Sequence, residues 1–377
     1  MFTFLSNAWD INRANGFINW FYSPEFVFGI AKYAICILIG IIVAYIVCIK
    51  EAEKFGIHHD DAIVCLTIIV PLAILGARIW YMVGDGISTF KNYWDYSRSI
   101  KGFSGFGSIF TTFFYVVLDV VGYNSYYGTY DGISGLAIHG GIIVAFSLAT
   151  LCCFWKKWKP LVLCDKVAPG LFIGQIFGRW GNFFNQEAHG TVIGGWTLEG
   201  DNLIPNLTVA EQYDKMIHTF HIPKFIAKNM YIEGNEQYYY GLIDGVQKYG
   251  TIVGSNFYHP TFLYESMLNL LGLILYFVLR RQKWVKNGFF IGYYLIWYGL
   301  VRFFIEIVRT DSLYLGGTGL KLAQVSSIIM ILIGAFVMVY IYLIRKQDFY
   351  VDTMKKYLAE QKAIVEKEET EEVVNVE

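Results

Sequence analysis

The stretch GFFIGYYLIWYGLVRFFIEIVR, residues 288–309, decides the class of protein. It is apolar over a length that can cross a bilayer, which takes about 20 residues of helix. Tyr298, Arg302, Glu306 and Arg309 are spaced so that, at about 3.6 residues per turn, they share one face. Arg302 and Glu306 stand four residues apart and can pair directly. The stretch therefore predicts a membrane helix with a polar stripe near one end.

Six further stretches are as long and as apolar as this one. They are residues 26–49, 61–83, 133–154, 161–184, 260–280 and 320–345. Over the whole chain 55% of residues are hydrophobic and 16% are charged, whereas soluble domains carry about 25% charge. We therefore expect an all-α integral membrane protein with seven transmembrane helices.

The distribution of lysine and arginine predicts the orientation of these helices. Basic residues gather after the first, third, fifth and seventh spans, at Lys50 and Lys54, Lys156 to Lys159, Arg281 to Lys286, and Arg345 to Lys356. Because basic loops stay on the cytoplasmic side, the N-terminus is expected outside and the C-terminus inside. Residues 103–121 are also apolar, but an eighth span there would move a basic cluster to the wrong side.

The remaining segments divide the chain into three parts. Residues 1–25 are expected to be an external or interfacial lead-in, and residues 26–345 the transmembrane catalytic domain. That domain carries external insertions at 84–132 and 185–258, of which the second is polar enough to form a small external head domain. Residues 346–377 form a cytoplasmic acidic tail, which its composition predicts to be disordered.

Polar residues recur near the outer ends of the other predicted spans. They are Lys32 and Tyr33, Arg78, His139 beside Gly140, Arg179 and Asn182, and His259, Tyr264 and Glu265, with Glu187 and Gly190 just beyond a span. Each alone can be an interfacial anchor or a satisfied pair. Ionisable groups are costly in a membrane, however, so their common depth predicts one polar chamber open to the outer leaflet. Cations outnumber carboxylates there, which favours a phosphate-bearing lipid.

Four motifs in order carry a family resemblance. They are GLAIHGG (135–141), GRWGNFFNQEAHG (178–190), HPTFLYE (259–265) and the run from Tyr298 to Asp311. Together they resemble the bacterial prolipoprotein diacylglyceryl transferases over all seven spans. The resemblance implies transfer of the diacylglyceryl group of phosphatidylglycerol to the lipobox cysteine of prolipoproteins in the bacterial cell membrane. A thioether forms, glycerol phosphate leaves, and no metal or organic cofactor takes part.

The resemblance also implies roles for residues that match the family's motifs. The residues implied in catalysis are His139, Arg179, Tyr298, Arg302 and Glu306. Those implied in phosphatidylglycerol binding are Tyr33, Asn182, Glu187, Gly190 and Arg309. Two more binding residues are predicted without the resemblance: Arg78 from its charge at the same depth, and Gly140 because paired glycines let a lipid head group approach closely. We expect His139 to take the thiol proton and the arginines to stabilise the leaving phosphate. Departures from the family are Lys32 before Tyr33, the long outer segments and the acidic tail.

Three other classes of protein compete with this interpretation. A transporter or channel would need a polar path across the bilayer, but the inner halves of the spans are almost free of ionisable groups. Another enzyme acting on phospholipid or polyprenyl phosphate is opposed only by the motifs. A non-catalytic scaffold would have little use for so many outer arginines. Nucleic-acid binding is not expected, because there is no basic stripe and no reader motif.

Overall fold

The structure is a computed structural model that divides into two compact units. Unit 1 comprises Met1–Phe55 and Cys164–Glu377, and unit 2 comprises Gly56–Leu163. We describe each unit by itself. The residues described are 32–84, 88–100, 108, 111–112, 114–116, 118, 123–124, 129–130, 138–243, 246–310, 312, 319–344 and 347–374.

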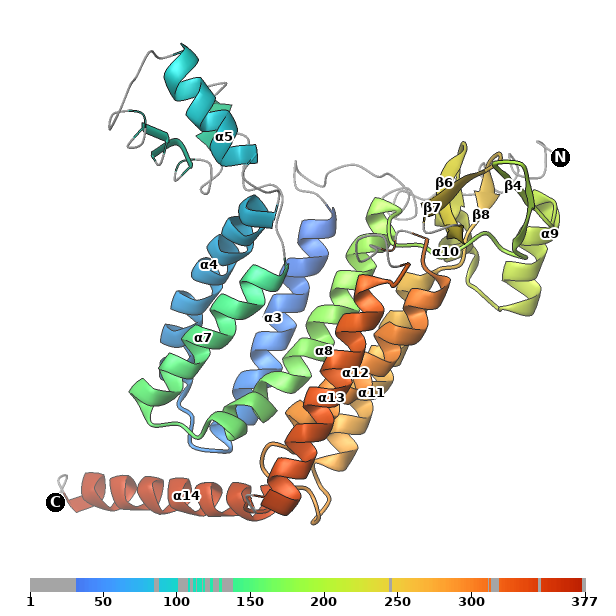
Figure 1. Cartoon of the computed structure of the whole chain (residues 1–377). Helices are drawn as coiled ribbons and strands as arrows, with labels where there is room; N and C mark the ends of the chain where they lie inside the picture. Colours follow the sequence, from blue (N-terminus) through green and yellow to red (C-terminus); the bar gives the residue numbers. More distant parts are fainter. Residues whose placement is uncertain are drawn as a thin grey trace, which may run out of the picture. The chain divides into compact units, whose positions relative to one another are not determined.

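Long apolar helices dominate unit 1 (Figure 1). They are α3 (Lys32–Glu53), α8 (Pro160–Asn185, whose first turn belongs to unit 2), α11 (Thr261–Leu279), α12 (Phe289–Val308) and α13 (Leu322–Val339), which η3 (Tyr340–Ile344) continues. Together with α4 of unit 2, these make six helices in the described ranges that are long and apolar enough to span a membrane. The chain is therefore a helical, multi-pass membrane protein.

Small residues bring the helices of unit 1 into close contact. A Cβ added to Gly40 on α3 would lie 2.8 Å from the Phe177 side chain on α8. On α12, a Cβ at Gly292 would come within 3.2 Å of the carbonyl oxygen of Gly334 on α13. Glycine at such crossings lets two backbones approach, which is how membrane helices gain packing where lipid is as apolar as their side chains.

A small α/β head connects α8 to α11, within the predicted head domain. Its strands are β3 (Trp196–Glu199), β4 (Asn202–Pro205), β5 (Tyr231–Ile232), β6 (Glu236–Ile243), β7 (Val246–Ile252) and β8 (Asn256–Phe257). Its helices are α9 (Val209–Asp214), η2 (Lys215–Thr219) and α10 (Lys224–Asn229). Four strands form one sheet in the order β3-β4-β7-β6, in which only the β4–β7 pair is parallel, and β5 pairs with β8. The sequence predicted a head here but not its strands.

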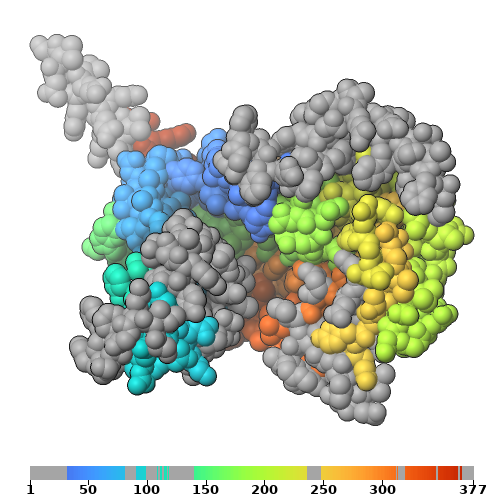
Figure 2. All heavy atoms as spheres, turned by 90° about the horizontal axis from the view of Figure 1, so that it is seen from above, coloured from blue at the N-terminus to red at the C-terminus, as the bar shows by residue number. Residues whose placement is uncertain are grey.

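The head has its own core and a satisfied buried amide. Met216, Ile226 and Phe257 are almost fully buried together with Phe183 at the end of α8. Gln212 is fully buried, and its Oε1 accepts from the backbone N–H of Phe257 at 2.8 Å. Because that core includes residues of α8, the head is anchored on the helix that carries most of GRWGNFFNQEAHG (178–190), which we call the signature motif. Seen from above, the yellow-green head leaves orange atoms of α12–α13 visible beside it (Figure 2).

The other end of unit 1 holds a buried acid–base pair. The Asp165 carboxylate accepts hydrogen bonds from the backbone N–H groups of Gly288 at 2.7 Å and Ile291 at 3.1 Å, so it caps the start of α12. Lys166 is 1% exposed, and its Nζ donates to the Tyr350 hydroxyl at 2.6 Å. Tyr350 begins α14 (Tyr350–Val374), a helix where the sequence analysis expected a disordered tail.

Unit 2 is built on an antiparallel helix pair. It holds α4 (His59–Gly84), α5 (Ser88–Asp95), η1 (Tyr96–Ile100), the short strands β1 (Tyr123–Asn124) and β2 (Thr129–Tyr130), and α7 (Ile138–Lys156). Lys156 at the end of α7 pairs with Asp61 at the start of α4, with Nζ 2.7 Å from Oδ1. The apolar part of α7, Gly140–Lys156, is shorter than the six candidate spans, so the count of seven stays a prediction.

Candidate active site

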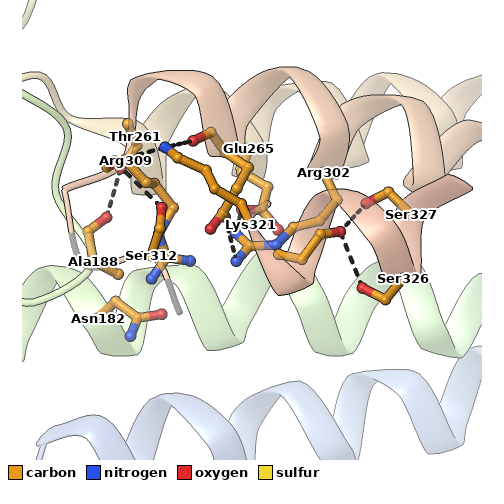
Figure 3. Close-up of polar contacts among 12 residues, drawn as sticks. Asn182, Ala188, Thr261, Glu265, Arg302, Arg309, Ser312, Lys321, Ser326 and Ser327 are labelled. Carbon is orange, nitrogen blue, oxygen red and sulfur yellow. Dashed lines mark hydrogen bonds and ion pairs between the residues drawn. The ribbon is translucent and has the colours of Figure 1, made fainter. Parts of the chain in front are cut away.

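Three helices of unit 1 bring together the charged side chains that we call the ionic layer: Arg179, Glu265, Arg302 and Glu306. Glu265 on α11 bridges the two arginines, with Oε1 2.9 Å from Arg179 Nη2 and Oε2 3.5 Å from Arg302 Nη1. Arg302 also pairs with Glu306, one turn further along α12, at 2.7 Å. The pairing of Arg302 and Glu306 predicted from their spacing is confirmed. Figure 3 draws Glu265 and Arg302 close together between the helix ribbons.

The ionic layer is deeply buried and electrically balanced. The side chains of Glu265 and Glu306 are each 1% exposed, and those of Arg179 and Arg302 are 17% and 16% exposed. Two arginines therefore face two carboxylates. On α12 alone, Arg302 and Arg309 outnumber Glu306, and Glu265 from α11 supplies the second carboxylate of the ionic layer. Affinity for an anion must then come from guanidinium N–H donors that the carboxylates leave available, since each guanidinium has five.

Amide side chains extend the ionic layer along the end of α8. Arg179 Nη1 donates to Asn182 Oδ1 at 3.5 Å, which confirms that these two residues share a helix face. Asn182 Nδ2 in turn donates to Glu187 Oε1 at 3.0 Å. Asn185 Nδ2 donates to the same oxygen at 3.2 Å, so two amides hold the exposed Glu187 carboxylate just beyond the helix.

Backbone pairing joins the signature motif to the ends of α11 and α12. Gly190 N–H donates to the carbonyl of His259 at 2.8 Å, and Gly190 also bridges with Arg309. A Cβ at Gly190 would lie 2.8 Å from the His259 side chain, 2.9 Å from that of Thr261 and 3.0 Å from that of Val308. Gly190 was predicted to bind substrate, and the structure supplies a packing reason for glycine at this position.

Two further cations lie at the C-terminal end of α12. Lys321, just before α13, donates from Nζ to the carbonyl oxygen of Glu306 at 2.6 Å. Arg309 follows the last turn of α12, and its carbonyl accepts from Ser312 at 3.4 Å. Figure 3 shows Arg309 and Lys321 in the same close-up as the ionic layer. Lys321 had no predicted role, because it lies at the very start of the predicted span 320–345.

Aromatic residues on α12 continue the stripe towards the membrane interior. Tyr298 interacts with Arg179 of the ionic layer. Its ring stacks on that of Tyr294, with centroids 5.8 Å apart. The Tyr294 hydroxyl accepts from Gln175 Nε2 at 2.6 Å. Neither Tyr294 nor Gln175 was predicted as a site residue, because isolated uncharged polar groups in a span give little signal.

The first helix of unit 1 contacts α8 beside the ionic layer. A Cβ at Gly181 would lie 2.7 Å from the Tyr33 ring, so Tyr33 packs directly against the signature motif. Lys32 is 4% exposed, and its Nζ lies 5.7 Å from the centroid of the Phe184 ring. The structure thus shows where Tyr33 packs, and its role in binding stays a prediction.

Three predicted site residues belong to unit 2. Arg78 is buried on α4. Gly140 packs at the crossing of α4 and α7, since a Cβ there would lie 2.2 Å from the carbonyl oxygen of Gly76. His139 occupies the second position of α7, and its side chain lies outside the described residues. Their participation in one chamber with the ionic layer stays a prediction.

His259 lies in the head next to the start of α11. Its Nδ1 is 3.2 Å from the Tyr264 hydroxyl, and its ring centroid is 5.5 Å from that of Phe220. Burial, reinforced by the charge of Lys215, lowers the pKa of His259 below its usual value. The imidazole is therefore neutral near pH 7 and holds Tyr264 beside Glu265.

Fold and site together define a multi-pass helical membrane protein with a buried, balanced layer of arginines and carboxylates below a folded head. The family model for prolipoprotein diacylglyceryl transferase matches residues 24–340. A phosphatidylglycerol–prolipoprotein diacylglyceryl transferase of Streptococcus uberis is 31% identical over 322 residues, which cover 85% of this chain and 93% of the relative. Enzymes of the same name from Streptococcus sanguinis and Lactobacillus johnsonii are 33% and 32% identical, covering 82% and 80% of this chain and 90% and 83% of their own. This chain belongs to the prolipoprotein diacylglyceryl transferase family and is a transferase.

Proposed function

We propose that this enzyme transfers the diacylglyceryl group of phosphatidylglycerol to the lipobox cysteine of a prolipoprotein, the first step of bacterial lipoprotein maturation. The observation that carries the proposal is the family match over residues 24–340, which includes every helix of the ionic layer. The buried arginines support a phospholipid substrate, because guanidinium groups bind phosphate in a planar, two-pronged way.

The reaction is a substitution at a glycerol carbon. The cysteine thiol loses its proton, sulfur forms a bond to the glycerol carbon, and the bond from that carbon to the phosphate oxygen breaks. Diacylglyceryl thioether and glycerol phosphate are the products. Since the thiolate is the nucleophile and a free thiol has a pKa near 8.5, a base must take the proton. We assign that role to His139, whose ordinary pKa near 6.5 suits it.

Negative charge grows on the phosphate as it leaves. Arg302 and Arg179 are the residues that we expect to stabilise this charge, in a site where low dielectric strengthens the interaction. Glu306 and Glu265 hold the two guanidinium groups in place, so they act as positioning residues. Asn182 and Tyr298, both in contact with Arg179, orient the head group. Arg78, Tyr33, Gly140, Glu187, Gly190 and Arg309 complete the proposed binding site.

The same proposal fixes the setting of the enzyme. It lies in the cell membrane with its N-terminus and head outside and its C-terminus in the cytoplasm. This orientation places the ionic layer at the outer leaflet, where a translocated precursor presents its cysteine. It also places the basic residues around Arg281 in the cytoplasm, as the positive-inside rule requires.

A transfer assay with purified protein tests the proposal. Phosphatidylglycerol and a lipobox peptide with one cysteine are incubated with the enzyme, and mass spectrometry reads the peptide. We expect a diacylglyceryl adduct that is absent when the peptide carries Cys→Ser. An unmodified cysteine peptide, from folded protein and with other phospholipids also supplied, would refute the proposal.

A matched pair of arginine variants tests the role of the ionic layer. Arg302→Ala should lower turnover by about 10²-fold or more, as the removal of one such electrostatic donor does elsewhere. Arg281→Ala, an exposed arginine beyond the other end of α11, should transfer normally. Near-normal transfer by folded Arg302→Ala would show that Arg302 does not stabilise the leaving phosphate.

A further inference from the structure

A second polar layer lies one helical turn deeper than the ionic layer. Two contacts between the antiparallel helices α8 and α11 define the depth. Arg179 pairs with Glu265 at 2.9 Å, and a Cβ at Gly272 would lie 2.7 Å from the ring of Phe172. Both contacts are seven residues apart on their helices, so the positions between them face each other at matching depths.

Gln175 and Asn269 occupy those intermediate positions. Gln175 stands four residues before Arg179, and Asn269 stands four residues after Glu265. Each therefore lies about 6 Å, slightly more than one turn, below its partner in the ionic layer. Tyr294 on α12 joins them through its hydrogen bond from Gln175 at 2.6 Å. All three are uncharged, in contrast to the residues above them.

This second layer has hydrogen-bonding capacity that the protein does not use. Asn269 is 0% exposed, and neither its Nδ2 nor its Oδ1 has a hydrogen-bond partner among the described residues. The same holds for Oε1 of the half-buried Gln175. Buried amides are almost always paired, because an unpaired donor or acceptor in an apolar setting is costly. An amide left unpaired in a membrane helix is therefore expected to form its hydrogen bond with another molecule that binds there.

We propose that the unpaired Nδ2 donor of Asn269 binds an ester carbonyl group of the lipid substrate. In a glycerophospholipid the acyl esters lie a few bonds deeper in the membrane than the phosphate. If the phosphate sits at the ionic layer, the esters reach the level of Asn269, whose N–H₂ group donates to carbonyl oxygens. The amide is enclosed in this structure, so neighbouring side chains must move as the lipid enters. The inference rests on the proposed function and specifies which part of the lipid the enzyme binds below the phosphate.

A diether lipid isolates this contact. Dialkyl phosphatidylglycerol keeps the head group and chains but lacks both carbonyl oxygens. In the transfer assay the wild-type enzyme should use the diester about fivefold to tenfold better in kcat/KM, which is the effect of one uncharged hydrogen bond. Asn269→Leu should use the diester about as slowly as the diether. Its ratio of kcat/KM for the diester to kcat/KM for the diether should therefore fall to about one. Asn269→Ala, which removes the same donor with a smaller side chain, provides a second variant with the same expected loss.

The controls separate this proposal from the function itself. Met267→Leu lies on the lipid-facing side of α11, is 57% exposed, and should keep the preference. Equal use of both lipids by the wild type, or an unchanged preference in both Asn269→Leu and Asn269→Ala, would overturn the ester contact. Failure of the wild type on the diester would instead overturn the proposed function, so the two failures are distinguishable.

Discussion

Replacing Glu265 with Gln removes the carboxylate that contacts both arginines of the ionic layer. Glutamine has nearly the same shape, so the change tests charge rather than packing. Glu265 is the nearer acid of Arg179, at 2.9 Å, whereas Arg302 retains Glu306 at 2.7 Å. Arg179 therefore loses its carboxylate partner in the layer, and Arg302 keeps its closer one.

The size of the effect follows from this geometry. Breaking a buried ion pair by removing one partner costs about 3–5 kcal/mol. The arginines keep 16–17% exposure, so we expect the lower end, about 3 kcal/mol, in the free energy of unfolding. Displacement of one phosphate-binding guanidinium should lower kcat by about 10²-fold. Glu306→Gln should cost less in kcat, because Glu265 still contacts Arg302.

The assay measures transfer rate and thermal midpoint for both variants in the same detergent. Glu199→Gln, an exposed change in the head, is the matched control and should alter neither quantity. A Glu265→Gln enzyme with wild-type turnover and stability would refute the idea that Glu265 organises the arginines. A lower kcat for Glu306→Gln than for Glu265→Gln would show that Glu306, and not Glu265, is the more important carboxylate for holding the arginines.

Three further predictions concern stability. Gly190→Ala should lower the thermal midpoint, with a cost of about 1–3 kcal/mol, because three side chains crowd its Cβ; an unchanged midpoint would show that the packing relaxes. Tyr350→Phe should destabilise by about 1–3 kcal/mol, since Lys166 loses its acceptor, and wild-type stability of this variant would argue against that anchor. The pKa of His259 is lowered, so the unfolded chain binds more protons, and stability should be complete above about pH 6.5 and fall below it. His259→Asn should flatten that slope in midpoints measured from pH 5 to 8, and an unchanged slope would assign it to other groups.

Periodicity within one helix was the most reliable guide from the sequence. The spacing of Arg302 and Glu306 predicted their ion pair, and that of Arg179 and Asn182 predicted a shared face. Both are contacts inside a helix, where about 3.6 residues per turn decides which side chains meet. Apolar length likewise predicted six of the helices to within a few residues.

Contacts between helices could not be predicted in the same way. Glu265 was visible near the start of α11, yet nothing in its own helix showed that it would bridge arginines from two others. That bridge arises only where α8, α11 and α12 pack together. Asn269 was passed over entirely, because a single asparagine in an apolar run says nothing about its neighbours.

Local composition gave no sign of the anchor at the start of the C-terminal segment. Disorder of the acidic run stays a prediction, but Tyr350, ahead of that run, is 1% exposed and bonded to the buried Lys166, which lies far away in sequence. This tertiary contact anchors the first turn of α14. In the head, turns and short strands of two to eight residues carry too little periodic signal to separate them from loops.

The most direct test of the central claim measures both products of one reaction. Phosphatidylglycerol labelled in its head-group glycerol is supplied with the lipobox peptide, and labelled glycerol phosphate and peptide adduct are counted together. The account predicts equal amounts of the two products from the wild type and neither from Arg302→Ala. Glycerol phosphate released without an adduct, or an adduct formed without it, would contradict transfer of the diacylglyceryl group to cysteine.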